Sequence, residues 1–243
     1  MKWFSKAAVG GLLWLTFSAA AFGDTLFVTG YTEDVIDGGQ FSAYLASNPM
    51  QTLLIYCADY RNEEGSPETV NVSTPLSVAA IADTRYGTTP TANFSFFNTG
   101  AGALSALDRY VLAGWLTTQF DFTSGVTTSD DQIQNSIWTL LSTNGTSEFP
   151  FGDGLGTGTW ITQAATWESS RSVSALTTFE STVHVYTSTT VALDNDLTQD
   201  AGSRYTVGIQ EFIGVSSVPE PATFAMLGAG LLALGLCRKR TKA

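Results

Sequence analysis

Cys57 is the residue in the middle of this sequence with the greatest capacity for chemistry. It stands in the segment Ile55–Asp59, which reads IYCAD and is expected to end a strand. The other cysteine, Cys237, lies near the C-terminus in a segment that we expect to be removed. Cys57 then has no intramolecular disulfide partner. A lone thiol in an oxidising compartment is either buried and inert or takes part in a chemical reaction.

A second segment carries a glutamine that is expected to be partly buried. Residues 133–138 read IQNSIW, and Gln134, Trp138 and Leu141 share one face of a predicted helix at steps of four and three. A glutamine on that face needs a partner for its amide. On these observations alone, Cys57 can be a buried, inert cysteine and Gln134 a glutamine that bonds only to backbone.

The N-terminal segment is typical of a secretory signal peptide. Lys2 and Lys6 supply its positive start, residues 7–17 are mostly apolar, and the small residues Ala21 and Gly23 suit a signal peptidase. A retained membrane anchor is the alternative, but the apolar run is short for a span. We therefore expect Met1–Gly23 to be removed on export.

The C-terminal segment, residues 218–243, combines three features in a fixed order. An extended motif of Val218, Pro219, Glu220 and Pro221 precedes the apolar run Phe224–Cys237, and positive charge follows at 238–242. This arrangement resembles the PEP-CTERM sorting signal, a short transmembrane helix with its basic end on the cytoplasmic side. The resemblance implies recognition by an exosortase-type membrane protease and cleavage near Pro221. The precursor would be tethered to the inner membrane transiently, and the domain would reach the cell surface or extracellular matrix. A permanent C-terminal anchor is the alternative.

The segments around Cys57 and Gln134 also resemble the paired motifs of thioester-forming domains of exported surface proteins. In that family an aromatic residue or leucine precedes the cysteine, as Tyr56 does, and the glutamine stands four residues before a tryptophan, as in Gln134 and Trp138. The resemblance implies that the Cys57 thiolate attacks the Gln134 side-chain carbonyl carbon, expels ammonia and leaves an acyl thioester. Tyr56 or Trp138 would shield this bond from water. An outside amine or hydroxyl would then take the Gln134 acyl group and free the thiol.

This resemblance covers about Leu53 to Leu141 and includes one further match, at Asp59, and two departures, at Ser136 and Thr139. Exported proteins with the same type of tail often carry an aspartate two residues after the cysteine, as Asp59 is here, where it could orient a neighbour or cap the strand end. Ser136 replaces the usual alanine, and Thr139 stands where those proteins often have glutamate. Neither change touches the reacting pair.

Charge narrows the choice of partners. The expected single domain, residues 24–217, holds five arginines, no lysine and 21 acidic residues, so its net charge is −16. Such a surface repels phosphate backbones and excludes nucleic acid as a partner. Extracellular polysaccharide or a surface protein is the expected partner instead.

Conventional active sites are not expected. His184 is the only histidine, lies in a predicted strand and is assigned a structural role, which excludes a histidine-rich zinc site. Asp194, Asp196 and Asp200 alternate, but the glycine and distal glutamate of a calcium loop are missing, so an acidic turn is favoured. We expect no metal, no cofactor and no enzymatic turnover.

The elements expected to position the pair give an α+β fold, with an antiparallel sheet or sandwich and two or three packed helices. Hydrophobic periodicity predicts helices over 101–120, 129–141 and 159–175, with Ser129 as N-cap of the second. Strands are predicted over 24–32, 52–60, 70–73, 93–98, 179–188 and 203–212.

Two functions follow. The first is an exported, surface-sorted protein that attaches covalently, once per molecule, to polysaccharide or protein in the matrix. The second is a non-reactive structural component of the matrix or envelope with a buried free cysteine.

Overall fold

The computed structural model describes residues 23–35, 38–58, 67–88, 91–93, 102–142, 157–189 and 210–216. The signal segment, Asp59, the aspartates at 194–200 and the sorting tail lie outside the described residues. The strands are β1 (Asp24–Val35), β2 (Gly38–Leu45), β3 (Asn48–Cys57), β4 (Glu68–Ser73), β5 (Ala92–Asn93), β6 (Ala103–Leu104), β7 (Val183–Ser188) and β8 (Phe212–Val215). The helices are α1 (Ala106–Thr117), α2 (Thr128–Leu141), α3 (Thr157–Ser169) and α4 (Val173–Glu180). The α+β class is therefore correct.

The main sheet is a closed barrel rather than an open sheet or sandwich. Its strand order is β1-β2-β3-β8-β7-β4, and β5 and β6 form a separate pair. Neighbouring strands of the barrel are antiparallel, including β1 with β4, which closes it. Alternate residues of a strand face opposite sides. One set therefore fills the barrel: Leu26, Phe41, Ala43, Ile55, Cys57, Val70, Tyr186 and Phe212.

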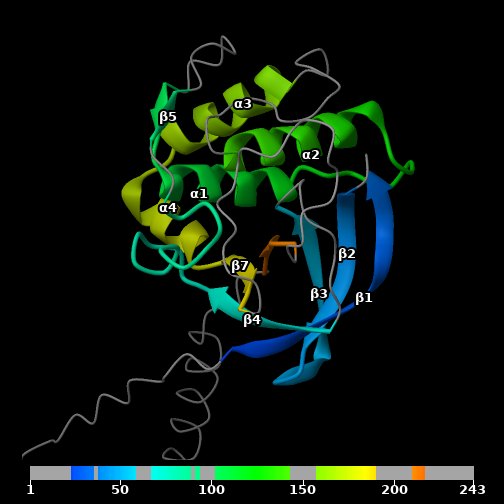
Figure 1. Ribbon diagram of the computed structural model, residues 1–243. Helices are drawn as coiled ribbons and strands as arrows, with labels where there is room; N and C mark the ends of the chain where they lie inside the picture. The colour runs from blue at the N-terminus through cyan, green and yellow to red at the C-terminus, as the bar shows by residue number, and fades with distance from the viewer. Residues whose placement is uncertain are drawn as a thin grey trace, which may run out of the picture.

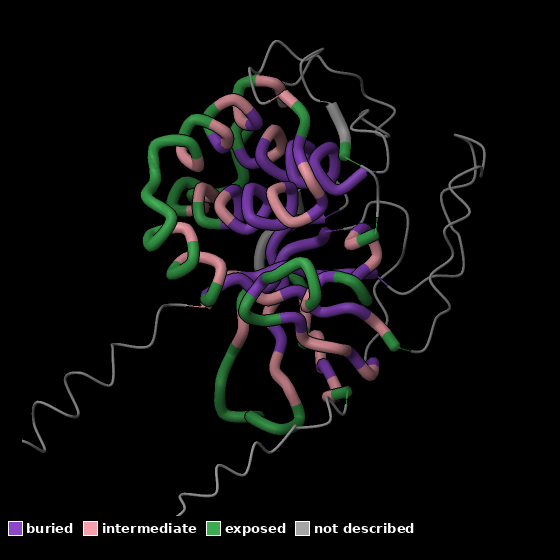
Figure 2. The backbone as a smooth tube through the Cα atoms, turned by 90° about the vertical axis from the view of Figure 1, so that its left-hand side faces the viewer, coloured by how far each residue is buried: buried purple, intermediate pink, exposed green. Residues whose placement is uncertain are grey.

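The other set of strand residues packs against the helices. Tyr56, Val183, Val185 and Ile213 belong to one buried cluster with residues of α1, α2 and α3. Figure 1 shows these helices stacked over the upper part of the barrel, with the β2–β3 hairpin extending away from them. Burial is accordingly concentrated where helices and strands meet, and the far end of the hairpin is exposed (Figure 2).

Local capping sets the starts of the first two helices. α1 begins at Ala106, later than predicted, because the N-cap Ser105 forms a capping box with Asp108. The predicted Ser129 cap of α2 is wrong. Thr127 is the N-cap, and the Asp130 carboxylate accepts hydrogen bonds from the Thr127 backbone N–H at 2.8 Å and hydroxyl at 2.7 Å. The spacing of Thr127 and Asp130 in the sequence is itself a capping-box signal, and it begins two residues before the predicted cap.

The third predicted helix, 159–175, is two helices. α3 ends at Ser169, and Ser172 caps α4 by accepting a hydrogen bond from the Ala175 backbone N–H. Near the break the Ser170 hydroxyl donates to the Trp167 carbonyl at 2.7 Å. Serines compete in this way for backbone groups and favour helix ends. α4 also occupies the start of the strand predicted at 179–188, which begins only at Val183.

The remaining strand predictions are mixed. The strands predicted over 24–32 and 70–73 are confirmed as parts of β1 and β4. The strand predicted over 52–60 is confirmed up to Cys57, where β3 ends, and residues 59–60 lie outside the described residues. Residues 94–98 and 203–209 lie outside the described residues, and β8 begins at Phe212, where the last predicted strand ends. β2 was missed because it opens with Gly38 and Gly39, residues that disfavour strands.

Candidate functional site

The barrel and α2 bring Cys57 and Gln134 together. Cys57 ends β3, where it pairs with Phe212 of β8, and its side chain faces the barrel interior. Gln134 lies on the face of α2 that also carries Trp138, and both Cys57 and Gln134 have 0% exposure. The pair is therefore removed from bulk water.

Two hydrogen bonds hold the Gln134 amide beside Cys57. Its Nε2 donates to the Cys57 backbone carbonyl at 2.8 Å, and its Oε1 accepts from the Gly39 backbone N–H at 3.2 Å. These bonds supply the partners that a buried amide requires. They also tie α2 to the ends of β2 and β3, so they fix the amide relative to the thiol.

Trp138 covers the sulfur. Its indole Nε1 donates to the Cys57 Sγ at 3.3 Å, and its side chain belongs to the barrel-interior cluster. The ring lies where a side chain at position 38 would be, because a Cβ on Gly38 would come within 2.6 Å of the Trp138 Cζ2. Glycine at this position is therefore what allows the indole to reach the cysteine.

Tyr56 occupies the opposite face of β3. Its ring stacks on Phe120 with centroids 4.8 Å apart, and its hydroxyl accepts a hydrogen bond from Gln40 Nε2 at 2.5 Å. Burial raises the pKa of the Tyr56 phenol. Among the two aromatic residues considered as shields, Trp138 is the one that contacts the sulfur.

The two departures from the thioester motif lie on the buried part of α2. The Ser136 hydroxyl donates to the Gln132 carbonyl at 2.7 Å, within the helix. Thr139 is 2% exposed, and within the described residues its hydroxyl has no hydrogen-bond partner. Neither side chain has a described hydrogen bond to Cys57 or Gln134.

Gln210 is a member of the site that the sequence did not reveal. It directly precedes Glu211 and β8, is 5% exposed, and its amide Nε2 donates to the Cys57 Sγ. It is 153 residues from Cys57 in sequence, so only the closure of the barrel brings them together. No local motif marks it.

Glu211 anchors the segment that carries Gln210. Its carboxylate accepts hydrogen bonds from the Tyr110 hydroxyl at 2.6 Å, the Arg85 backbone N–H at 2.8 Å and the Thr187 hydroxyl at 2.7 Å. Its backbone carbonyl accepts from the Ala58 N–H at 2.9 Å. Burial, and then the charge of Glu211, hold the pKa of the Tyr110 phenol well above its usual value. A fully buried carboxylate is stable here because several donors surround it.

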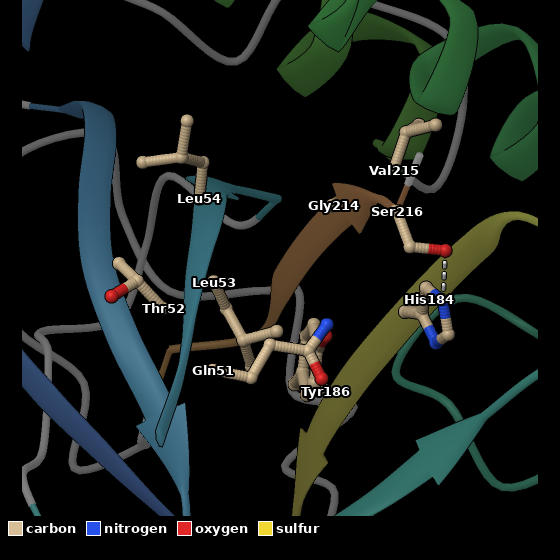
Figure 3. Close-up of a pocket in the computed structure, with 9 residues that line it drawn as sticks. All are labelled: Gln51, Thr52, Leu53, Leu54, His184, Tyr186, Gly214, Val215 and Ser216. Carbon is tan, nitrogen blue, oxygen red and sulfur yellow. Dashed lines mark hydrogen bonds between the residues drawn. The ribbon is translucent and has the colours of Figure 1, made fainter. Parts of the chain in front are cut away.

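A separate surface pocket of about 190 Å³ opens between β3, β7 and β8 (Figure 3). His184 and Tyr186 line one side and Gln51 and Leu53 the other, and the His184 Nε2 lies 2.9 Å from the Ser216 hydroxyl. Burial lowers the pKa of His184, which favours its neutral form. The pocket lining does not include Cys57 or Gln134, so His184 is not part of the Cys57 site.

The helical layer contains a carboxylate with an unusual pKa. Glu168 on α3 is half-buried, and burial followed by the charges of Asp108 and Glu180 raises its pKa to about 7. Glu168 has no described hydrogen bond to Cys57 or Gln134.

No cluster of histidine, cysteine and carboxylate side chains suited to a metal ion occurs among the described residues. Within that same part of the chain, no helix has the length and apolar character needed to cross a membrane.

Comparison with known proteins identifies the end of the chain. Residues 217–240 match the family model described as "PEP-CTERM protein-sorting motif". No curated protein and no solved structure matches the chain significantly. The match supports the predicted C-terminal sorting signal, and it implies an exported protein with a membrane-anchored precursor that an exosortase processes. The chain is therefore one that carries a PEP-CTERM sorting motif at its C-terminus.

Proposed function

We propose that the sorted protein forms one internal thioester between Cys57 and Gln134 and uses it to attach covalently to a partner outside the cell. The observation that carries the proposal is the position of the Gln134 amide, whose Nε2 lies 2.8 Å from the backbone carbonyl of Cys57 itself. This hydrogen bond holds the amide at the residue that carries the thiol, and proximity of two reacting groups raises their rate of reaction.

The first step exchanges an amide for a thioester. The Cys57 sulfur attacks the Gln134 Cδ, the Cδ–Nε2 bond breaks, and the thiol proton leaves with the nitrogen as ammonia. In the second step an amine or hydroxyl of the partner attacks the same carbon, and the C–S bond breaks. The product is an amide or ester to the partner, and the Cys57 thiol is restored.

Burial favours survival of the bond until a partner arrives. Cys57 and Gln134 are both fully buried, and Trp138 covers the sulfur. Exclusion of water suppresses hydrolysis of a reactive intermediate. The same burial predicts that small amines react faster than bulky ones.

The sorting tail supplies the context in which such a bond would be useful. A protein with a PEP-CTERM motif is exported through a membrane-anchored precursor, and we propose that it meets hydroxyls of matrix polysaccharide or amines of surface proteins. Residues 24–217 contain no lysine, so this region offers no side-chain amine of its own. Each molecule would react once, which is attachment rather than enzymatic turnover.

Labelling with methylamine tests this function. The mature protein should take up one methylamine at Gln134 and release one thiol at Cys57. Cys57→Ala and Gln134→Ala should each abolish labelling while leaving the fold intact. Gln132→Ala, on the same helix but outside the pair, is the matched control and should label normally.

A specific observation favours the second candidate, a non-reactive matrix protein. The Gln134 amide is hydrogen-bonded at both its nitrogen and its oxygen, which also suits a glutamine that only ties α2 to the barrel. Absence of methylamine uptake, with a free Cys57 thiol in the folded wild type, would establish that alternative.

A further inference from the structure

We propose that Gln210 is a positioning residue for the Cys57 chemistry, acting as a hydrogen-bond donor that stabilises negative charge on the sulfur. This inference rests on the proposed function and extends it to a residue that no motif includes. It starts from the contact between the Gln210 side-chain amide and the Cys57 Sγ.

Negative charge on the sulfur is needed in both steps of the reaction. The thiolate is the nucleophile when the thioester forms and the leaving group when the partner attacks. Burial opposes that charge, because an apolar environment disfavours ionised groups. Around Cys57 the barrel-interior cluster is mostly apolar, so hydrogen-bond donors aimed at the sulfur should matter.

Two neutral donors reach the sulfur from different elements. The Trp138 indole comes from α2 at 3.3 Å, and the Gln210 amide comes from the segment before β8. They form a donor pair at the atom where charge develops. Donors fixed before the reaction stabilise such charge without reorganisation.

The fold fixes Gln210 in place. The backbone carbonyl of Glu211 accepts the Ala58 N–H at 2.9 Å, and Phe212 pairs with Cys57 across the β3–β8 ladder. The buried Glu211 carboxylate anchors the same segment through Tyr110. Because of these contacts Gln210 lies beside the cysteine rather than on a free loop.

Gln210 and Gln134 make different contacts. The Gln134 amide bonds to backbone groups of Cys57 and Gly39, whereas the Gln210 amide donates to the sulfur. The proposed function assigns the acyl group to Gln134, and the contact with the sulfur leads us to assign the donor role to Gln210. Peptide mapping of a methylamine-labelled sample can show which glutamine carries the label.

Titratable side chains lie on both faces of the barrel wall: the buried Glu68 of β4 pairs with Leu26 of the barrel-interior cluster, so it lies on the same face of the sheet as Cys57. Tyr186 lies in the barrel-interior cluster with Cys57, and Tyr56 and Glu211 lie on the outer face with their own hydrogen-bond partners. Burial raises the pKa of both tyrosines, which favours their neutral forms.

The decisive test measures the thiol directly, in a background that cannot form the thioester. In the full chain carrying Gln134→Leu and Cys237→Ala, so that Cys57 is the remaining thiol, thiolate absorbance is followed against pH, with and without Gln210→Met. Loss of a hydrogen bond to a charged group should raise the thiol pKa by about one to two units, a tenfold to hundredfold loss of thiolate at a given pH. Gln40→Met is the matched control, because Gln40 is a buried barrel glutamine that bonds to Tyr56 instead of the sulfur.

A second readout uses the protein with Gln134 intact. Gln210→Met should slow thioester formation and methylamine labelling by a similar factor, with the label still at Gln134. Gln210→Glu keeps the length of the side chain but replaces the donor with a carboxylate, and it should raise the thiol pKa further. This variant keeps the test informative if Gln210→Met does not fold.

An unchanged thiol pKa in folded Gln210→Met and Gln210→Glu would overturn the inference, and so would a methylamine label at position 210. If the wild type forms no thioester but the thiol pKa responds as expected, the proposed function fails and the donor role of Gln210 stands.

Discussion

Filling the space at Gly38 is a stringent test of the role assigned to Trp138. In Gly38→Ala the new Cβ would lie 2.6 Å from the Trp138 Cζ2, whereas carbon atoms in contact prefer about 3.5–4.0 Å. Gly38 is not among the glycines with positive φ, so alanine adds no backbone strain there. The indole must therefore shift by about 1 Å, and its 3.3 Å hydrogen bond to the Cys57 sulfur should weaken.

The effect of Gly38→Ala can be measured on the stability of the fold and on the rate of methylamine labelling. Overpacking of a well-filled core costs about 1–3 kcal/mol, which denaturant unfolding would measure as a lower midpoint with an unchanged slope. A displaced indole weakens one donor to the sulfur but also lets water and amines reach the acyl carbon. If the cover limits the reaction, this gain in access outweighs the lost donor, and methylamine labelling and hydrolysis should both become faster.

Gly114→Ala separates these two effects. A Cβ at this position on α1 would lie 2.8 Å from both Val183 methyl carbons, on the helix side of the barrel wall and away from the thiol. Overpacking there should lower stability, while any gain in helix propensity offsets part of the loss. The role of Trp138 as a cover is refuted if the two alanine variants lose similar stability and both label at the wild-type rate.

Three further outcomes are expected. Glu211→Gln replaces one carboxylate oxygen, which accepts hydrogen bonds, with an NH₂ group that cannot accept them. This change should lower the free energy of unfolding by about 1–3 kcal/mol in denaturant titration; an unchanged midpoint would contradict the anchoring role. Because the folded-state pKa of Glu168 is raised to about 7, its stability contribution is present below the ordinary carboxyl value and is lost as pH rises toward 7. Glu168→Gln should therefore be more stable than the wild type at pH 8 by about 1 kcal/mol, after discounting for its partial exposure, and not at pH 4, as thermal melts at both values would show. Mass spectrometry of protein recovered from the cell surface should find neither residues 1–23 nor the segment after about Pro221, and recovery of that tail on surface material would contradict the predicted processing.

The local parts of this structure were accessible from sequence, and the parts created by barrel closure were not. The spacing of Gln134 and Trp138 predicts a buried helix face, and the structure has both side chains on it. Strand alternation also separates Tyr56 from Cys57, so their opposite orientations follow from a period of two. By contrast, Gln210 reaches the sulfur only because β8 inserts between β3 and β7. Neither hydrophobic periodicity nor a motif encodes a contact over 153 residues.

Turn and cap chemistry explains the errors in element boundaries. Helical periodicity continues across Ser170 and Ser172, yet serine hydroxyls there divide one predicted helix into α3 and α4. The glycines at the start of β2 weaken the strand signal of a segment whose Gly39 N–H holds the Gln134 amide. Gly38 and Gly39, which made this segment look unlike a strand, are thus the residues that allow α2 to approach the barrel.

The intact mass of the mature, folded protein tests the central claim most directly. If Cys57 and Gln134 are joined, the wild type is lighter than its sequence by one ammonia and its thiol resists alkylation, whereas Cys57→Ala and Gln134→Ala have their full sequence masses. A wild type of full mass with a freely alkylated Cys57 would contradict the covalent mechanism and leave a structural protein of the matrix.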